Sequence, residues 1–225
     1  MLKLVLFDID GTLIRTGGAG VHAFARTGAA EFHIPDGMRQ MQFAGRTDTS
    51  LVREFFTRHG IAATPENFRR FFDRYVFWLD HLLPQHPGGV CPGVRELLAG
   101  LRALPRPPLL GLQTGNIRLG AEIKLRHFGL WDWFEVGGFG DDSESRGELT
   151  RLAVERAARR LGHRLVPEAV LVVGDTPHDV DCARAVGARV LAVATGGATR
   201  EQLATRSPDW LVDDLTGVRA TDLAA

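Results

Sequence analysis

Residues 2–13 read LKLVLFDIDGTL, and we expect the rest of the fold to be built around this segment. An apolar run rich in Leu, Val and Phe ends at two carboxylates, Asp8 and Asp10, and a Gly-Thr turn follows them. The run predicts a short buried strand, because such strands are apolar throughout and stop at turn residues. Unpaired carboxylates buried at a strand end are strongly unfavourable unless they find a partner, so we expect a metal, a cation or a reacting ligand beside them.

The composition excludes several classes of protein. The two cysteines, Cys91 and Cys182, lack C-x-x-C spacing, which disfavours a disulfide scaffold and a structural zinc site. Basic and acidic residues balance at 27 each, so nothing indicates a nucleic-acid or membrane surface. No apolar stretch has the length of a transmembrane span or a signal segment. We therefore expect a cytoplasmic protein without nucleic-acid or membrane partners, and we leave its oligomeric state open.

The section from residue 15 to residue 87 is predicted to be helical. Apolar residues recur at spacings of three and four in three segments, about 21–32, 51–60 and 65–83. The aromatic side chains of the third segment are expected to pack in a core rather than to form a ligand pocket. Because glycine and proline clusters flank the section and it contains no convincing strand, we predict an inserted helical domain over residues 15–87.

The remaining residues, 1–14 and 88–225, alternate between strand and helix patterns. This alternation predicts an α/β fold, a Rossmann-like parallel sheet with helices on both faces. After the first strand the predicted elements are a helix at 93–104, a strand at 109–113, a helix at 117–128, a strand at 134–136, a helix at 148–161, a strand at 169–173, a helix at 179–186, and strands at 189–193 and 210–212.

Polar residues follow three of these strands, and the ends of parallel strands meet at one edge of a sheet. Asp8 and Asp10 follow the first strand, Thr114 follows the strand at 109–113, and Asp175 and Asp179 follow the strand at 169–173. Several carboxylates at one point make an oxygen-rich site suited to Mg²⁺. One carboxylate could attack phosphorus while the second one of the Asp-x-Asp pair transfers a proton.

The transferred phosphoryl group also needs donors. The Thr114 hydroxyl and the backbone amides of Gly115 and Asn116 are candidates, and a cation is needed to balance the charge that develops. A calcium loop starting at Asp8 is excluded, because the sixth position would be Leu13 and not Gly.

These motifs resemble those of the haloacid dehalogenase superfamily, in particular the phosphatases with a helical (C1-type) cap inserted after the first motif, such as phosphoglycolate phosphatases. The resemblance rests on DIDGT at 8–12, TGN at 114–116 and GDTPHD at 174–179. It implies that Asp8 is the nucleophile, that Asp10 is the general acid and base, and that Thr114 binds phosphate. It also implies that Mg²⁺ is bound by the Asp8 carboxylate, the Asp10 main-chain carbonyl and Asp175, with Asp179 completing or supporting this set.

The chain departs from that pattern at the cationic position. The family usually has a lysine before the last acidic motif, whereas the corresponding stretch, residues 141–149, reads DDSESRGEL and offers only Arg146. An arginine can bind a phosphoryl group and a carboxylate together, so we assign the position to Arg146. Lys124 is the alternative, and we interpret it as a solvated lysine on a helix.

The expected activity is Mg²⁺-dependent hydrolysis of a small phosphorylated metabolite through an aspartyl-phosphate. A phosphomutase and a non-catalytic binding protein on the same fold remain as alternatives. We hypothesise that Arg46, in the loop at 45–48, binds the far end of the substrate. The sequence does not identify which phosphate ester this is, because the inserted domain varies independently of the chemistry.

Overall fold

A six-stranded sheet forms the centre of the protein in the computed structural model, which describes residues 1–224. Every neighbouring pair of strands is parallel, and the strand order is β5-β4-β1-β6-β7-β8. The chain runs from β1 to β4 and β5 on one side and then crosses from β5 to β6 on the other side of β1, so β1 lies at a switch point, where ligands bind in open parallel sheets. The strands are β1 (Leu4–Phe7), β4 (Leu109–Gln113), β5 (Val136–Gly138), β6 (Val170–Gly174), β7 (Arg189–Val193) and β8 (Trp210–Val212).

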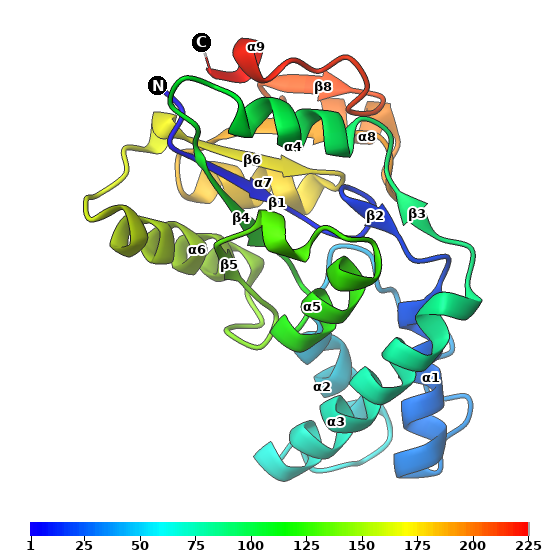
Figure 1. The fold of residues 1–225 in the computed structure, drawn as a ribbon. Coiled ribbons are helices and arrows are strands. Elements are labelled where there is room, and N and C mark those ends of the chain that lie inside the picture. The colour runs from blue at the N-terminus through cyan, green and yellow to red at the C-terminus, as the bar shows by residue number, and fades with distance from the viewer. Residues whose placement is uncertain (225) are drawn as a thin grey trace.

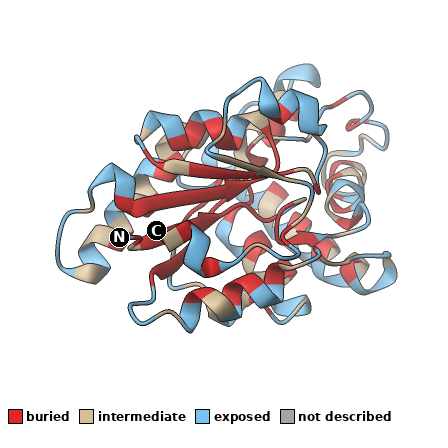
Figure 2. Cartoon of the chain, turned by 90° about the horizontal axis from the view of Figure 1, so that it is seen from above, coloured by how far each residue is buried: buried red, intermediate tan, exposed pale blue. Residues whose placement is uncertain are grey.

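Helices cover both faces of this sheet. Side chains alternate along β1, so that Val5 and Phe7 face one apolar cluster while Leu4 and Leu6 face another. Figure 2 shows the buried strands between helices whose outer surfaces are exposed. The first cluster contains side chains of α4 (Val94–Arg102), α5 (Arg118–His127) and α9 (Ala220–Ala224), and the second contains side chains of α6 (Arg146–Leu161), α7 (Pro177–Ala185) and α8 (Arg200–Ala204). The predicted α/β fold with a Rossmann-like sheet is confirmed.

Three helices form a lobe at the carboxyl ends of the strands, and we call them the helical lobe: α1 (Ala19–Phe32), α2 (Asp48–Arg58) and α3 (Pro65–Leu82). They lie together, away from the sheet, with α5 between them and the strands (Figure 1). A third apolar cluster joins them, and Phe24, Phe55 and Phe71 are buried in it. The packing role expected for the aromatic residues of the third helix is therefore confirmed for Phe71. The division into residues 15–87 and the rest stays a prediction.

A two-stranded antiparallel ribbon joins the helical lobe to the sheet. It consists of β2 (Ile14–Arg15) and β3 (Gly89–Val90), and Ile14 pairs with Val90. Arg15 lies within the section where we expected no strand, so that expectation was wrong by one residue; strands of two residues are too short to leave a periodic signal. Beside the ribbon, a Cβ on Gly17 would lie 2.0 Å from the Pro87 carbonyl oxygen, so only glycine allows the two connections to approach this closely.

Several element boundaries differ from the sequence prediction by one to three residues, among them those of β5 and α6. The strand expected at 134–136 is β5, at Val136–Gly138, because a short 3₁₀ helix (η2, Trp131–Trp133) precedes it. The sheet tolerates two glycines there because α6 packs directly on the strand: a Cβ on Gly138 would lie 2.0 Å from the Leu149 carbonyl oxygen. Helix α6 begins at Arg146, two residues before the predicted start. Two further 3₁₀ helices span Leu83–Gln85 (η1) and Pro167–Ala169 (η3).

Among residues 1–224, no helix combines the length and the apolar character that crossing a bilayer requires.

Candidate active site

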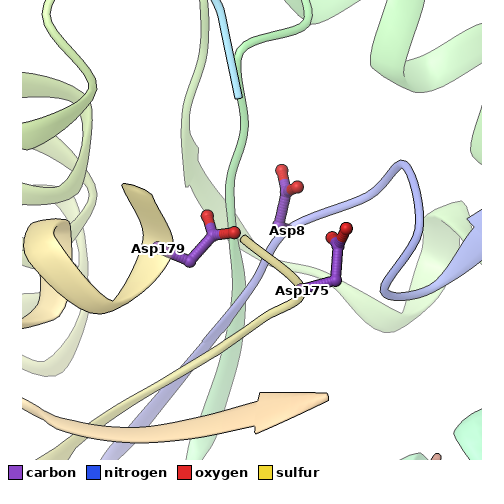
Figure 3. Close-up of side chains that lie close together, drawn as sticks. All are labelled: Asp8, Asp175 and Asp179. Atoms are coloured by element: carbon purple, nitrogen blue, oxygen red, sulfur yellow. The ribbon is translucent and has the colours of Figure 1, made fainter. Parts of the chain in front are cut away.

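Three buried carboxylates meet at the ends of the central strands. Asp8 directly follows β1, Asp175 directly follows β6, and Asp179 lies in the first turn of α7. Each offers an oxygen within 4.8 Å of the oxygens of the other two, and Figure 3 shows Asp8, after β1, close to Asp175 and Asp179 of the segment that joins β6 to α7. The predicted convergence of the strand-end acids is therefore confirmed for these three residues.

Two of the three carboxylates, Asp8 and Asp175, lie in an environment that disfavours their charge. Burial raises the pKa of Asp8 to about 7, with Arg146 opposing that rise and Asp179 and Asp10 adding to it. Burial also raises the pKa of Asp175 well above its usual range, and the neighbouring charges of Asp8 and Asp179 act in the same direction. The Thr12 hydroxyl donates to Asp175 Oδ1 at 2.8 Å and lowers the pKa only in part. The cluster is thus short of positive charge.

Asp179 is already engaged at both oxygens. Its Oδ2 accepts hydrogen bonds from the backbone amide of Thr176 at 3.0 Å and from the Thr176 hydroxyl at 2.6 Å. Its Oδ1 accepts from Gln113 Nε2 at 2.7 Å and from Arg146 Nη2 at 2.5 Å. Four donors occupy the directions in which a carboxylate accepts. Asp179 therefore fixes the start of α7 and the position of Arg146, although it lies close enough to belong to the carboxylate cluster.

Arg146 extends from the first residue of α6 into this cluster. Its Nη2 lies 3.4 Å from Asp8 Oδ1 as well as 2.5 Å from Asp179 Oδ1, and its side chain is only 10% exposed. Burial alone would lower the pKa of Arg146, but Asp179 and Asp8 raise it overall, so the guanidinium stays charged. Its Nε is buried and has no hydrogen-bond partner within residues 1–224.

Lys124 is a second buried cation at the site, and our interpretation of it as a solvated lysine was wrong. Its side chain is 5% exposed, and Nζ contacts Asp10 Oδ1 at 2.9 Å, Asp10 Oδ2 at 2.7 Å and Asn116 Oδ1 at 2.6 Å. Lys124 occupies the inner face of α5, which packs between the sheet and the helical lobe, so its long side chain reaches back to the strand ends. Helical periodicity did not reveal that Lys124 is buried, because the charge of its ammonium group is balanced by Asp10, which lies far away in the sequence.

The predicted phosphate-binding residues lie beside Asp10. The Thr114 hydroxyl accepts from the Asn116 backbone amide at 3.2 Å and from Asn116 Nδ2 at 2.8 Å, which leaves its own proton available. Asn116 Nδ2 also donates to Asp10 Oδ2 at 2.7 Å. The Asn116 backbone amide is therefore occupied, whereas that of Gly115 makes no hydrogen bond within residues 1–224. The side chain of Asp10 faces Lys124 and Asn116 and is not part of the carboxylate cluster.

The helical lobe docks on the sheet through the start of α2. The Asp48 backbone amide donates to the Gly115 carbonyl oxygen at 2.7 Å, and Asp48 Oδ2 accepts from the Ile117 amide at 2.9 Å. A Cβ on Gly115 would lie 2.2 Å from the Arg46 carbonyl oxygen, so glycine is required where the two parts touch. Burial raises the pKa of Asp48 to about 7, while Lys124 and the Ile117 amide favour its charged form.

A cavity of about 310 Å³ lies between the strand ends and the helical lobe. Its lining includes every site residue predicted from the sequence except Asp179; Arg46 is included, but its guanidinium is already paired with Glu54 and donates to the Ser50 carbonyl oxygen at 3.2 Å. The predicted residues in the lining are Asp8, Asp10, Arg46, Thr114, Gly115, Asn116, Arg146 and Asp175.

Sequence reasoning missed four residues of this region. Thr12 donates to Asp175 and Gln113 donates to Asp179; Thr12 lies within the recognised motif at 8–12, and Gln113 directly precedes the one at 114–116. Asp48 reads as an acidic residue in the first turn of a helix, and Tyr75 reads as part of an apolar stripe. The position of Gln113 at a strand end could have indicated its role, but nothing local distinguishes Asp48 or Tyr75.

Comparisons with known proteins agree with this geometry. The family model for haloacid dehalogenase-like hydrolases matches residues 2–187. The phosphoglycolate phosphatase of Synechococcus elongatus is 32% identical over 212 residues, which cover 94% of this chain and 93% of that one. The probable phosphatase IndB of Dickeya dadantii is 30% identical over 222 residues, which cover 97% and 92% of the two chains.

A solved structure supports the fold. CbbY from Rhodobacter sphaeroides, solved in complex with phosphate, superimposes with a TM-score of 0.74 over 97% of this chain and 96% of that chain. The two are 22% identical, so this likeness concerns the fold alone. The family match covers most of the chain, and the phosphatase relatives cover nearly all of it. The chain is therefore an enzyme that belongs to the haloacid dehalogenase-like hydrolase family, among the phosphatases similar to phosphoglycolate phosphatase.

Proposed function

We propose that the protein hydrolyses a small phosphate monoester with the help of Mg²⁺ and through an aspartyl-phosphate on Asp8. One observation carries the proposal: Asp8 lies at the end of the central strand, in the same cavity as the Thr114 hydroxyl, the Arg146 guanidinium and the Asp10 carboxylate. A nucleophile, a proton-transferring group and two donors for a phosphoryl group are thus gathered around one volume.

The donor set fits a hard divalent cation. Asp8 and Asp175 offer carboxylate oxygens, and burial together with mutual repulsion raises the pKa of both, so a bound cation would stabilise their charged forms. All three members of the cluster are oxygen donors, as Mg²⁺ prefers. We assign Asp8, the Asp10 main-chain carbonyl and Asp175 as its ligands, with Asp179 in a supporting role. Bound there, Mg²⁺ would neutralise charge on the nucleophile and on the phosphoryl oxygens.

The reaction divides into two steps at Asp8. Its carboxylate attacks phosphorus, and the bond to the leaving oxygen breaks as Asp10 gives that oxygen a proton. Asp10 then takes a proton from water, which attacks the aspartyl-phosphate and releases inorganic phosphate. Lys124 and Asn116 keep the Asp10 carboxylate in place through hydrogen bonds of 2.7–2.9 Å. Thr114 and Arg146 donate to the phosphoryl oxygens as they accumulate charge.

The test is a phosphate-release screen over phosphorylated metabolites in Mg²⁺ or in EDTA. Wild type should release phosphate only with Mg²⁺, and Asp8→Asn should lose at least about 10⁴-fold in kcat, since a nucleophile is removed. Asp80→Asn is the matched control, because Asp80 is exposed on α3 and does not line the cavity. Phosphate release that persists both in EDTA and in the Asp8→Asn variant would contradict the mechanism. Isomerised sugar phosphate in place of free phosphate would favour the phosphomutase alternative.

A further inference from the structure

The wall that the helical lobe gives to the cavity is largely apolar. Phe24 of α1, Leu51 of α2 and Phe43 of the intervening loop line it, and the first two are almost fully buried. This wall faces the strand-end residues across the cavity, so it contacts the part of the substrate that leaves after the phosphoryl group has been transferred. A cavity of about 310 Å³ lies at the lower end of the range for ligand sites, so it suits a small alcohol.

No cation of the cavity is free to bind a second anionic group. The lining contains three basic side chains, Arg46, Lys124 and Arg146. Lys124 has three acceptors for its three protons, and Arg46 is paired with Glu54. Arg146 is held between two carboxylates at the position of the phosphoryl group. A carboxylate on the leaving alcohol would therefore enter a buried volume without a counter-charge, which is strongly unfavourable.

Two polar atoms of the wall, Asp48 Oδ1 and the Tyr75 hydroxyl oxygen, lack hydrogen-bond partners among residues 1–224. Asp48 uses Oδ2 to accept from Ile117, while its Oδ1 accepts no hydrogen bond from any residue in the range 1–224. Tyr75 is 1% exposed, lines the cavity, and its hydroxyl has no hydrogen-bond partner in the same range. Burial and the nearby charges of Asp48 and Asp10 raise the pKa of Tyr75, so the phenol remains protonated. The wall thus presents a carboxylate acceptor and a hydroxyl group to whatever fills the cavity.

We infer that the site selects phosphate monoesters of small neutral alcohols that carry a second hydroxyl group, and that it discriminates against alcohols that carry a carboxylate. The second hydroxyl donates to Asp48 Oδ1 and accepts from the Tyr75 hydroxyl, which satisfies both buried groups. A carboxylate in the same place meets the like charge of Asp48. This inference rests on the proposed phosphatase activity and names the class of its substrate.

A matched pair of substrates tests it. 2-Hydroxyethyl phosphate and 2-phosphoglycolate differ only by a hydroxymethyl group in place of a carboxylate, and n-propyl phosphate supplies the same length without either. Assays at pH 8 with Mg²⁺ keep Asp48 charged, because its pKa is about 7. We expect kcat/KM to favour 2-hydroxyethyl phosphate at least about tenfold over both others. A second pair uses a longer alcohol: kcat/KM for glucose 6-phosphate, which is neutral apart from its phosphate, is compared with that for 6-phosphogluconate, which carries a carboxylate.

Two variants separate selection from a structural role. Asp48→Asn keeps an oxygen for the Ile117 amide but removes the charge, so kcat/KM for 2-phosphoglycolate should rise and the preference should shrink about tenfold. Tyr75→Phe keeps the ring and should lower kcat/KM for 2-hydroxyethyl phosphate about tenfold with 2-phosphoglycolate unchanged. Asp80→Asn, on the exposed face of α3, should leave the ratio as in wild type.

The outcomes distinguish the two proposals. Wild type that prefers the carboxylate member of both pairs, or that hydrolyses n-propyl phosphate as well as 2-hydroxyethyl phosphate, overturns the inference and leaves the phosphatase intact. An Asp48→Asn variant that loses activity equally on both members of each pair also overturns it. Failure to release phosphate from any monoester with Mg²⁺ overturns the proposed function itself, and the inference with it.

Discussion

The two sides of the cavity differ in how their residues are arranged along the chain. On the strand side, Asp8, Thr114 and Asp175 each directly follow a strand of the central sheet. On the lobe side, Asp48 and Tyr75 come from different helices, and both line the cavity because α2 and α3 pack together. In the proposed function, the strand side carries the groups that act on phosphorus and the lobe side carries the groups that contact the leaving alcohol. This proposal assigns chemistry and selection to separate parts of the fold.

The largest effect should come from the strand side, at Asp10. Asp10→Asn removes the proposed acid and base but can keep the hydrogen bond from Lys124 through its amide oxygen. We expect kcat to fall about 10³- to 10⁴-fold with a KM within about threefold of wild type. Steady-state phosphate release measures both constants. A fall in kcat/KM that came from KM alone would show that Asp10 binds substrate and does not transfer protons.

Substitution of Arg146 should give the second-largest effect on kcat. Arg146→Met removes the cation beside Asp8 and should lower kcat about 10²- to 10³-fold, because the charge on the phosphoryl oxygens loses a donor. Arg146→Lys keeps the charge and should recover at least about tenfold of that loss. If the lysine variant is as inactive as the methionine variant while its melting temperature equals that of wild type, charge at this position is not what catalysis requires.

Lys124 links the two sides of the cavity, since its ammonium group contacts Asp10 and its charge also attracts that of Asp48. Lys124→Met should lower kcat about tenfold through the loss of the hydrogen bonds that place Asp10. Lys3→Met is the matched control, because Lys3 is the only other lysine of the chain. Equal activity of the two variants would contradict a positioning role for Lys124.

Asp48, on the lobe side, should make the stability of the folded protein depend on pH. The folded-state pKa of Asp48 is raised from 3.8 to about 7, so its contribution to stability is fully present below pH 3.8 and is lost as the pH rises through 7. Metal-free protein should therefore melt at a lower temperature at pH 8 than at pH 5, and Asp48→Asn should reduce that difference by several degrees. Calorimetry in EDTA measures it. An unchanged difference in the variant would mean that other groups cause the pH dependence.

Arg46 should give the smallest effect. Its guanidinium is already paired with Glu54, so Arg46→Ala should change KM by less than about threefold for the best substrate. A larger rise in KM, with kcat unchanged, would revive the hypothesis that Arg46 binds the far end of the substrate and would weaken the argument that no cation of the cavity is free.

The difference between the strand side and the lobe side of the cavity also explains which residues could be predicted from the sequence. The strand pattern and the motifs at 8–12, 114–116 and 174–179 placed Asp8, Thr114 and Asp175 at one edge of a sheet, because local sequence determines where a strand ends. Lys124 could not be placed, since its burial depends on Asp10 and Asn116, which contact it only in the folded protein. Tyr75 was expected to pack in the core, and it does, but the cavity beside its hydroxyl results from the packing of three helices.

The small ribbon of β2 and β3 has a consequence for protein engineering. Ile14 and Val90 are paired neighbours, so the chain leaves the sheet and returns to it at the same place. Residues 16–88 could therefore be replaced by a short turn or by the corresponding lobe of a relative without moving β1 or β4. The inserted segment would need to cover Ile117, the N-cap residue of α5, and Ile123 of α5, because both pack against the lobe. A library of such chimaeras would retain one catalytic chemistry while sampling many substrates.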